Sequence, residues 1–264
     1  MTTFRLLLPT LALLAAAAPV PAQSPAAALP GPAADSAPDA LVGLRGERLT
    51  PGRWRYLSTV ARGEERVELG RRTLSIEATT HDGAAAWRLV DETEARGQRM
   101  ADTLLVARDD LRPLRRAAAM GPLRLSLDFT PSGARGTMRA PGGGETPLAL
   151  ATAGPVVASA AMLEAVLRLS PLAAGWRGRV VQLGLTPSGV AATPLALAVV
   201  GEETVATPAG ERAAWVVTAT AGGAEQRLWV AKEGGVLLRQ RASPPHAADF
   251  VYETTLVEAP PAGG

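Results

Sequence analysis

One pattern occurs twice in this 264-residue chain, as LLVARDDLRPLR at Leu104–Arg115 and as LWVAKEGGVLLR at Leu228–Arg239. Each copy is an apolar run, a turn of charged residues or glycine, and a second run that contains an arginine at its end. Such a unit is typical of two antiparallel strands joined by a short turn. Because two copies are too few for a solenoid, we interpret them as the two wings of one curved sheet.

A second shared pattern precedes each copy. The sequence THDG at residues 80–83 stands before Trp87, and TPAG at residues 207–210 stands before Trp215. Proline at the second position and glycine at the fourth favour a type I turn in the latter. Each copy is therefore predicted to belong to a longer meander of antiparallel strands.

Alternating apolar and polar residues extend the β pattern along the chain. In the stretch 73–79, Leu74, Ile76 and Ala78 are placed on one face, and Leu123–Phe129 alternates in the same way. One-sided alternation is typical of an antiparallel sheet with one face in water.

One segment has helical rather than strand periodicity. Apolar residues recur at helical spacing in Pro155–Ser170, with proline placed to begin the helix, and Glu164 and Arg168 form an i,i+4 pair on the opposite face. The predicted fold class is mainly β (α+β): a single curved antiparallel sheet or half-barrel, in which two meanders flank one central helix.

The N-terminal sequence predicts export. Arg5 precedes a short apolar run, and small residues follow it, as in a secretory signal peptide. We expect a signal peptide at 1–22, a disordered Ala- and Pro-rich leader at 23–41, a single β-rich domain at 42–258 and a disordered tail at 259–264. No later stretch is apolar enough for a transmembrane anchor. The chain has no cysteine, so we expect a soluble periplasmic or extracellular protein that is not a lipoprotein.

The charge pattern gives no sign of nucleic-acid binding. The chain has 27 Lys and Arg residues and 25 Asp and Glu residues. Removal of Arg5 with the signal peptide leaves 26 − 25 = +1. Basic residues alternate with carboxylates and form no aromatic-studded basic stripe, which argues against a nucleic-acid partner.

The motifs of common enzymes are missing from the sequence. His81 and His246 stand in loop-like contexts without other metal ligands, and there is no Gly-x-Ser-x-Gly elbow, thiol or P-loop. Asp109-Asp110 and Asp91-Glu92 could act as paired carboxylates, but we interpret them as solvated turn and edge residues. Arginines 108, 112, 115 and 116 are likewise interpreted as a solvated strand face. We expect no catalytic residue, metal site or cofactor.

Five tryptophans stand out in a chain that is otherwise poor in aromatic residues. They could line a hydrophobic ligand cavity, or they could fill the core between helix and sheet, and we favour core packing. The candidate cavity residues are Trp87, Leu163, Val166, Leu167, Trp215 and Trp229.

Several phrases together resemble one protein family. They are the helix-and-exit sequence from Leu163 to Leu172 followed by Gly175, and the sequence from Val200 to Gly210 followed by Trp215. These resemble a family of exported bacterial proteins known only as a domain of unknown function, over most of the stretch 54–257. That family is similar in fold to the LolA/LolB lipoprotein carriers. The resemblance implies a curved antiparallel sheet that wraps helices around a hydrophobic cavity, and it implies no catalytic residue.

Two functions follow as hypotheses. The first is a non-enzymatic periplasmic carrier or binder of a hydrophobic or lipidic small molecule. The alternative is a cell-envelope protein-interaction module that has no ligand and docks an envelope protein.

Overall fold

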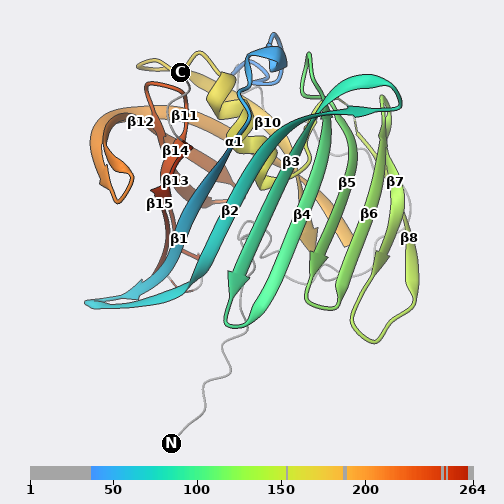
Figure 1. Ribbon diagram of the computed structural model, residues 1–264, viewed down its shortest axis with the longest axis horizontal. Helices are drawn as coiled ribbons and strands as arrows, with labels where there is room; N and C mark the ends of the chain where they lie inside the picture. Colours follow the sequence, from blue (N-terminus) through green and yellow to red (C-terminus); the bar gives the residue numbers. More distant parts are fainter. Residues whose placement is uncertain (1–36, 153, 187–188, 245–246, 248, 261–264) are drawn as a thin grey trace, which may run out of the picture.

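The computed structural model describes residues 37–152, 154–186, 189–244, 247 and 249–260 (Figure 1). The predicted signal peptide, residues 23–36 of the predicted leader, residues 261–264 of the tail and His246 lie outside the described residues. The described chain contains one 15-stranded sheet, one α-helix and a short 3-10 helix, η1, at Gly46–Arg48.

The first half of the chain is an antiparallel meander of eight strands. Its strands are β1 (Gly52–Arg62), β2 (Glu65–His81), β3 (Ala84–Ala95), β4 (Gln98–Ala107), β5 (Pro113–Met120), β6 (Leu123–Thr130), β7 (Gly133–Arg139) and β8 (Glu145–Ala151). They lie in the sheet in chain order, because each is joined to the next by a short turn.

The second half contains the helix and the remaining strands. In chain order these are β9 (Val156–Val157), α1 (Ala160–Leu169), β10 (Arg177–Thr186), β11 (Gly189–Thr207), β12 (Gly210–Ala221), β13 (Ala224–Ala231), β14 (Leu237–Ala242) and β15 (Phe250–Glu258). The last strand, β15, pairs antiparallel with the first, β1, and this pairing joins the two halves into one sheet.

The repeated pattern has the same local structure in both copies. The first copy is the β4–β5 hairpin, with a register shift between Leu105 and Val106, and the second is the β13–β14 hairpin, with a shift between Trp229 and Val230. These two shifts occupy equivalent positions in the pattern. In each copy the backbone N–H of the alanine at the end of the first strand donates across the turn, with a donor–acceptor distance of 2.8 Å. The duplication seen in the sequence is therefore a duplication of backbone geometry.

The preceding strands are also equivalent. A cation from the hairpin turn lies over the tryptophan of the preceding strand in each copy, Arg108 over Trp87 at 4.8 Å and Lys232 over Trp215 at 4.0 Å. These contacts fix each turn against the neighbouring strand of its own meander.

Helix α1 is shorter than the predicted segment. It begins after Ser159, whose side-chain oxygen accepts a hydrogen bond from the N–H of Met162 at 3.2 Å, as an N-cap does. The residues before the cap, Val156 and Val157, form strand β9 instead of a first helical turn. Branching at Cβ restricts their side chains in a helix and favours the strand.

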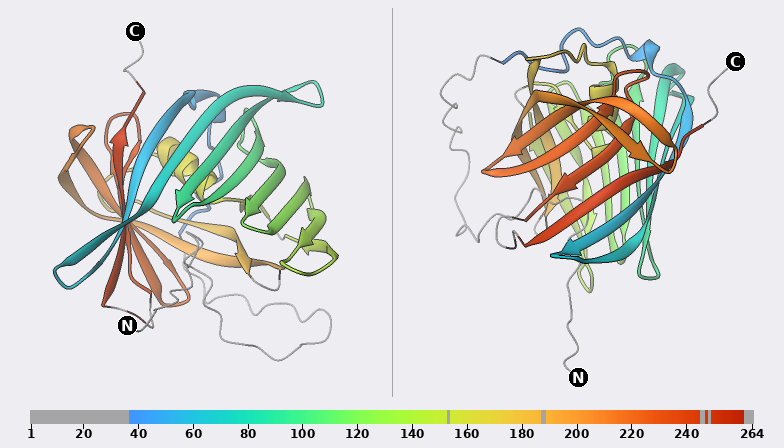
Figure 2. Two further views of the ribbon diagram at one scale, coloured as in Figure 1. Left: turned by 60° about the horizontal axis from the view of Figure 1, so that its bottom comes forward. Right: turned by 90° about the vertical axis from the view of Figure 1, so that its left-hand side faces the viewer.

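The predicted fold class is wrong. The structure is mostly β, with a single short helix, and its sheet is mixed because β9 pairs in parallel with β10. The sheet is one layer of fifteen strands that does not close, since β8 and β9 stand at opposite ends of the strand order. The two meanders are the two halves of this one sheet. They are continuous through β1 and β15, so the sheet curves around α1 (Figure 2).

Side chains, not strand pairing, hold the two ends of the curved sheet together. A cluster on β5, β6 and β7, which includes Leu125, Leu127 and Met138, packs against Leu185 of β10 and Val190 of β11. We call this contact the seam. The larger part of the core lies inside the curve and surrounds the apolar side chains of α1.

Residues near the ends of the described chain pack on the sheet. Asp39 forms an isolated bridge with Arg179, and Ala40 and Leu41 are buried in the main core. Within the described ranges, α1 with its ten residues is too short to cross a membrane.

Candidate functional site

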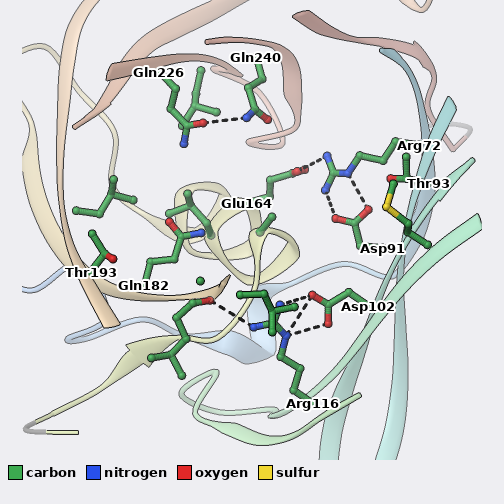
Figure 3. A pocket seen from close by; sticks show the side chains of 18 of the residues that line it. Arg72, Asp91, Thr93, Asp102, Arg116, Glu164, Gln182, Thr193, Gln226 and Gln240 are labelled. Atoms are coloured by element: carbon green, nitrogen blue, oxygen red, sulfur yellow. Dashed lines mark hydrogen bonds and ion pairs between the residues drawn. The ribbon is translucent and has the colours of Figure 1, made fainter. Parts of the chain in front are cut away.

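A cavity of about 140 Å³ lies inside the curve of the sheet, beside helix α1 (Figure 3). Its apolar lining comes from α1 and from strands of both halves: Met100, Ala101, Met120, Ala160, Leu163, Leu167, Leu183, Gly184, Leu185, Leu195, Ala221 and Leu228. Its polar lining consists of Arg72, Asp91, Thr93, Asp102, Arg116, Glu164, Gln182, Thr193, Gln226 and Gln240. The wall is therefore amphipathic, with several charged groups in an otherwise apolar interior.

One wall of the cavity carries a buried ion-pair group. The guanidinium of Arg72, 1% exposed, donates from Nε and Nη2 to the two carboxylate oxygens of Asp91 at 2.8 and 2.7 Å. Its Nη1 lies 2.5 Å from the carboxylate of Glu164 on helix α1, an ion pair without an aligned hydrogen bond. Arg72 therefore ties the sheet to the helix at the edge of the cavity.

A second ion pair lies further along the same wall. Arg116, 5% exposed, donates from Nε and Nη2 to the carboxylate of Asp102 at 3.0 and 2.6 Å. Its Nη1 donates to the backbone carbonyl of Leu183 at 3.3 Å. Leu183 belongs to β10, in the other half of the sheet, so this hydrogen bond crosses from one half to the other beside the seam.

The strand register brings these groups together. Tyr56 pairs with Arg72 across β1 and β2, Asp91 pairs with Asp102 across β3 and β4, and Arg116 follows on β5. Each of these residues is an even number of positions from buried apolar residues of its own strand, so its side chain points to the same inner face. The side chains therefore form one polar row on that face. We call these five residues the polar row.

Burial changes the protonation behaviour of the charged groups in the cavity wall. Burial raises the pKa of Glu164 above its ordinary value, although the nearby Arg72 opposes the shift. Burial also raises the pKa of Asp102 against the effect of Arg116. Burial would lower the pKa of Arg72, but its two carboxylate partners outweigh this and raise the pKa well above its ordinary value. Arg72 is therefore charged at every physiological pH, while Glu164 holds its proton to a higher pH than an exposed glutamate.

Uncharged polar side chains line the remaining part of the cavity. Gln240 donates from Nε2 to Oε1 of Gln226 at 2.9 Å, and Figure 3 shows the amide nitrogen of Gln226 directed into the cavity. Gln182 and Thr193, cross-strand partners on β10 and β11, lie on another side. These groups supply hydrogen-bond donors and acceptors that carry no charge.

Of the candidate cavity residues from the sequence analysis, some line the cavity and others do not. Leu163 and Leu167 line the cavity from helix α1. Val166, on the same helix, is fully buried in the core but does not belong to the lining.

The three candidate tryptophans lie away from the cavity. Trp87 is buried, and its Nε1 donates to the carbonyl of Gly46 at 2.9 Å. Trp229 donates from Nε1 to Glu203 at 2.8 Å. Trp215 is half-buried beneath Lys232. Each ring thus packs at a hairpin rather than along the cavity wall.

Several sequence interpretations were wrong about the charged residues. Arg116 and Asp91, interpreted as solvated, lie in the polar row. Glu164 pairs with Arg72 and not with Arg168. Arg168 instead lies over the ring of Trp54 at 4.0 Å, and its guanidinium nitrogens have no hydrogen-bond partner among the described residues. Burial lowers the pKa of Arg168.

Every charged group in the cavity wall has a partner of opposite charge. In the described part of the chain, no cluster of three or more His, Cys, Asp or Glu residues is suited to hold a metal ion. What the cavity offers is an apolar wall with uncharged hydrogen-bonding groups.

The chain belongs to a family of proteins of unknown function, DUF3108, whose model matches residues 55–245. The predicted membership of a domain-of-unknown-function family is thereby confirmed. No curated protein is similar to this chain at a significant level.

Two solved structures are similar to this chain at low sequence identity. The hypothetical lipoprotein YmcC from Escherichia coli K12 is 13% identical, with a TM-score of 0.34, over 78% of this chain and 87% of that one. A protein from Bacteroides fragilis NCTC 9343, described as exported and with a YmcC-like fold, is 9% identical, with a TM-score of 0.31, over 80% and 96% of the two chains.

Proposed function

We propose that this protein is a non-enzymatic carrier or binder of an amphipathic, lipid-like molecule, and that the molecule occupies the cavity inside the curved sheet. The amphipathic lining of that cavity is the observation that supports the proposal. The predicted signal peptide supports action outside the cytoplasm, in the periplasm or beyond the cell. The similarity in fold to the LolA/LolB carriers, which the resemblance to the domain-of-unknown-function family implies, belongs to this proposal as well.

The size of the cavity limits what it holds in this conformation. Its volume of about 140 Å³ is below the roughly 300–1,000 Å³ of pockets for drug-sized ligands. It is close to the roughly 150 Å³ of an engineered cavity that binds benzene. A head group or a few carbons of a chain fit, and a longer chain requires the cavity to widen.

The seam is where such widening costs least. At the seam, the two ends of the sheet are connected by apolar side chains and by the hydrogen bond from Arg116 to Leu183. Elsewhere in the sheet, all neighbouring strands are connected by backbone hydrogen bonds. Separation of the seam breaks no strand pairing. We therefore place the entry of the ligand at the seam.

Filling the cavity tests the proposal. Gly184 lines the cavity, and a Cβ added there meets no atom within 4 Å. Strand alternation places it on the face of Gln182, so the four-carbon side chain of Gly184→Leu enters the cavity. We expect this variant to bind the apolar probe 1-N-phenylnaphthylamine much more weakly than the wild type, at unchanged thermal stability.

Gly201→Leu is the matched control. Gly201 also lies on a strand, and a Cβ added there also meets no atom within 4 Å, but the residue does not line the cavity. Equal probe binding by both variants, or no binding by the wild type, would sink the proposal. Mass spectrometry of an organic extract of the purified protein adds a second measurement, since a carrier is expected to retain lipid.

The alternative of a protein-interaction module without a ligand stays a prediction. Strand β8 stands at one end of the sheet, where docking by strand addition could occur. It contains Pro147, however, and proline in edge strands is a common obstacle to pairing with another chain. A pull-down from envelope extract that finds no specific partner would count against this alternative.

A further inference from the structure

The charged groups of the cavity leave no cation free for an anionic ligand. All three nitrogens of the Arg72 guanidinium lie against Asp91 or Glu164. Those of Arg116 are directed at Asp102 and at the carbonyl of Leu183. An incoming carboxylate or phosphate could reach a guanidinium only by displacing a buried partner, which would leave that partner's charge uncompensated.

The net charge of the lining also disfavours an anion. Two arginines and three carboxylates give +2 − 3 = −1 when Glu164 is ionised and zero when it is protonated. In a low-dielectric interior an unpaired negative charge is costly. The cavity therefore has neither a free cation nor a positive field.

The uncharged groups are arranged for hydrogen bonding. Because Gln240 donates to Gln226, the amide nitrogen of Gln226 and the amide oxygen of Gln240 lie at opposite ends of the hydrogen-bonded pair (Figure 3). No hydrogen bond of the Gln226 amide nitrogen to another described residue occurs, and this nitrogen is directed into the cavity (Figure 3). The pair therefore presents a donor at one end and an acceptor at the other, and such a pair complements a hydroxyl or an amide, which both donates and accepts.

We propose that the cavity binds the uncharged head of an amphipathic molecule, a hydroxyl or amide group, through Gln226 and Gln240, and discriminates against free carboxylates and phosphates. This inference rests on the proposed function and names the class of its ligand. The ion pairs of the wall then act as fixed structure, and the glutamines act as the contacts that recognise the ligand.

The test compares three ligands that have the same ten-carbon acyl chain and different head groups. Decanamide, monodecanoin and decanoate compete for 1-N-phenylnaphthylamine on the full chain at pH 8. We expect the amide and the glycerol ester to displace the probe at concentrations at least about tenfold lower than decanoate, the effect of one or two neutral hydrogen bonds. Displacement by decanoate at equal or lower concentration overturns the inference while the carrier proposal stands. Failure of the wild type to bind the probe or any of the three overturns both.

Variants assign the discrimination to the glutamines. Gln226→Leu and Gln240→Leu should each weaken decanamide binding by about tenfold and leave decanoate binding unchanged. Gln98→Leu, the same change at an exposed strand position, is the control and should leave both unchanged. Unfolding curves show whether each variant is folded. A folded Gln226→Leu variant that binds decanamide as the wild type does contradicts the inference.

Discussion

The turn of the second hairpin offers a sharp test of how helix α1 is held beside the cavity. Gly235 has a φ of +62°, and a Cβ added there would lie 2.7 Å from both the Cα and the carbonyl oxygen of Arg168, in the last turn of α1. The preceding Gly234 has a φ of +72°, but a Cβ added there meets no atom within 4 Å. The two glycines share the backbone strain and differ only in their contact with the helix.

This difference gives the expected magnitudes. Alanine in the left-handed region costs about 1.5 kcal/mol at either position. Gly235→Ala additionally forces the helix backbone away, and overpacking of this kind costs about 2 kcal/mol more. At about 3 °C per kcal/mol for a domain of this size, the melting temperature should fall by about 4 °C in Gly234→Ala and by about 10 °C in Gly235→Ala.

Thermal unfolding followed by circular dichroism measures both effects, and probe binding reports the position of the helix. Because α1 contributes Leu163 and Leu167 to the cavity, Gly235→Ala should also change the affinity for 1-N-phenylnaphthylamine, and Gly234→Ala should not. Equal melting temperatures for the two variants would refute the argument that the turn holds the helix.

Two further predictions concern the charged residues of the cavity wall. Arg72→Met leaves two buried carboxylates without their cation and should cost about 3–5 kcal/mol, whereas Arg88→Met, in an exposed pair with Glu77 at 3.0 Å, should cost less than about 1 kcal/mol. Urea denaturation compares them, and similar losses would contradict the buried-pair argument. The raised pKa values of Glu164 and Asp102 mean that the folded chain holds protons that the unfolded chain releases, so their contribution to stability is present below about pH 4 and is lost as the pH rises through the folded values. Glu164→Gln should therefore lose less stability than the wild type between pH 4 and pH 8, and an identical slope would remove Glu164 as the cause.

The sequence predicted the strands of the repeated hairpins because alternation and turn residues are local signals. The predicted fold class was wrong because the sheet is mixed: β9 pairs in parallel with β10, and the alternation of residues within a strand does not reveal the direction of its partner. The start of helix α1 was misplaced because Val156 and Val157 are compatible with both a helical period and a strand, and the parallel partner β10 that decides between them is remote in sequence.

The polar row could have been found from the sequence by one further step. The inward parity of Leu74 and Ile76 extends to Arg72, and the inward parity of Leu104 and Val106 extends to Asp102. Two other members of the row, Asp91 and Arg116, were interpreted as solvated from their residue type, and Arg72 and Asp102 were given no role. The partner on the helix could not have been found in this way, because Glu164 is 92 positions from Arg72 and was placed on a solvated face by helical spacing alone.

The two copies of the repeated pattern differ where the helix is held. The position of Gly235 in the second copy corresponds to Leu111 in the first, and both have a φ near +60°. In the first copy the Leu111 side chain is fully buried beneath Gly46 of η1, and this packing offsets the strain of a left-handed leucine. In the second copy the absence of a side chain admits the last turn of α1. In the first copy, the turn thus packs its own side chain into the core. In the second copy, the same turn contacts helix α1, which contributes Leu163, Glu164 and Leu167 to the cavity lining.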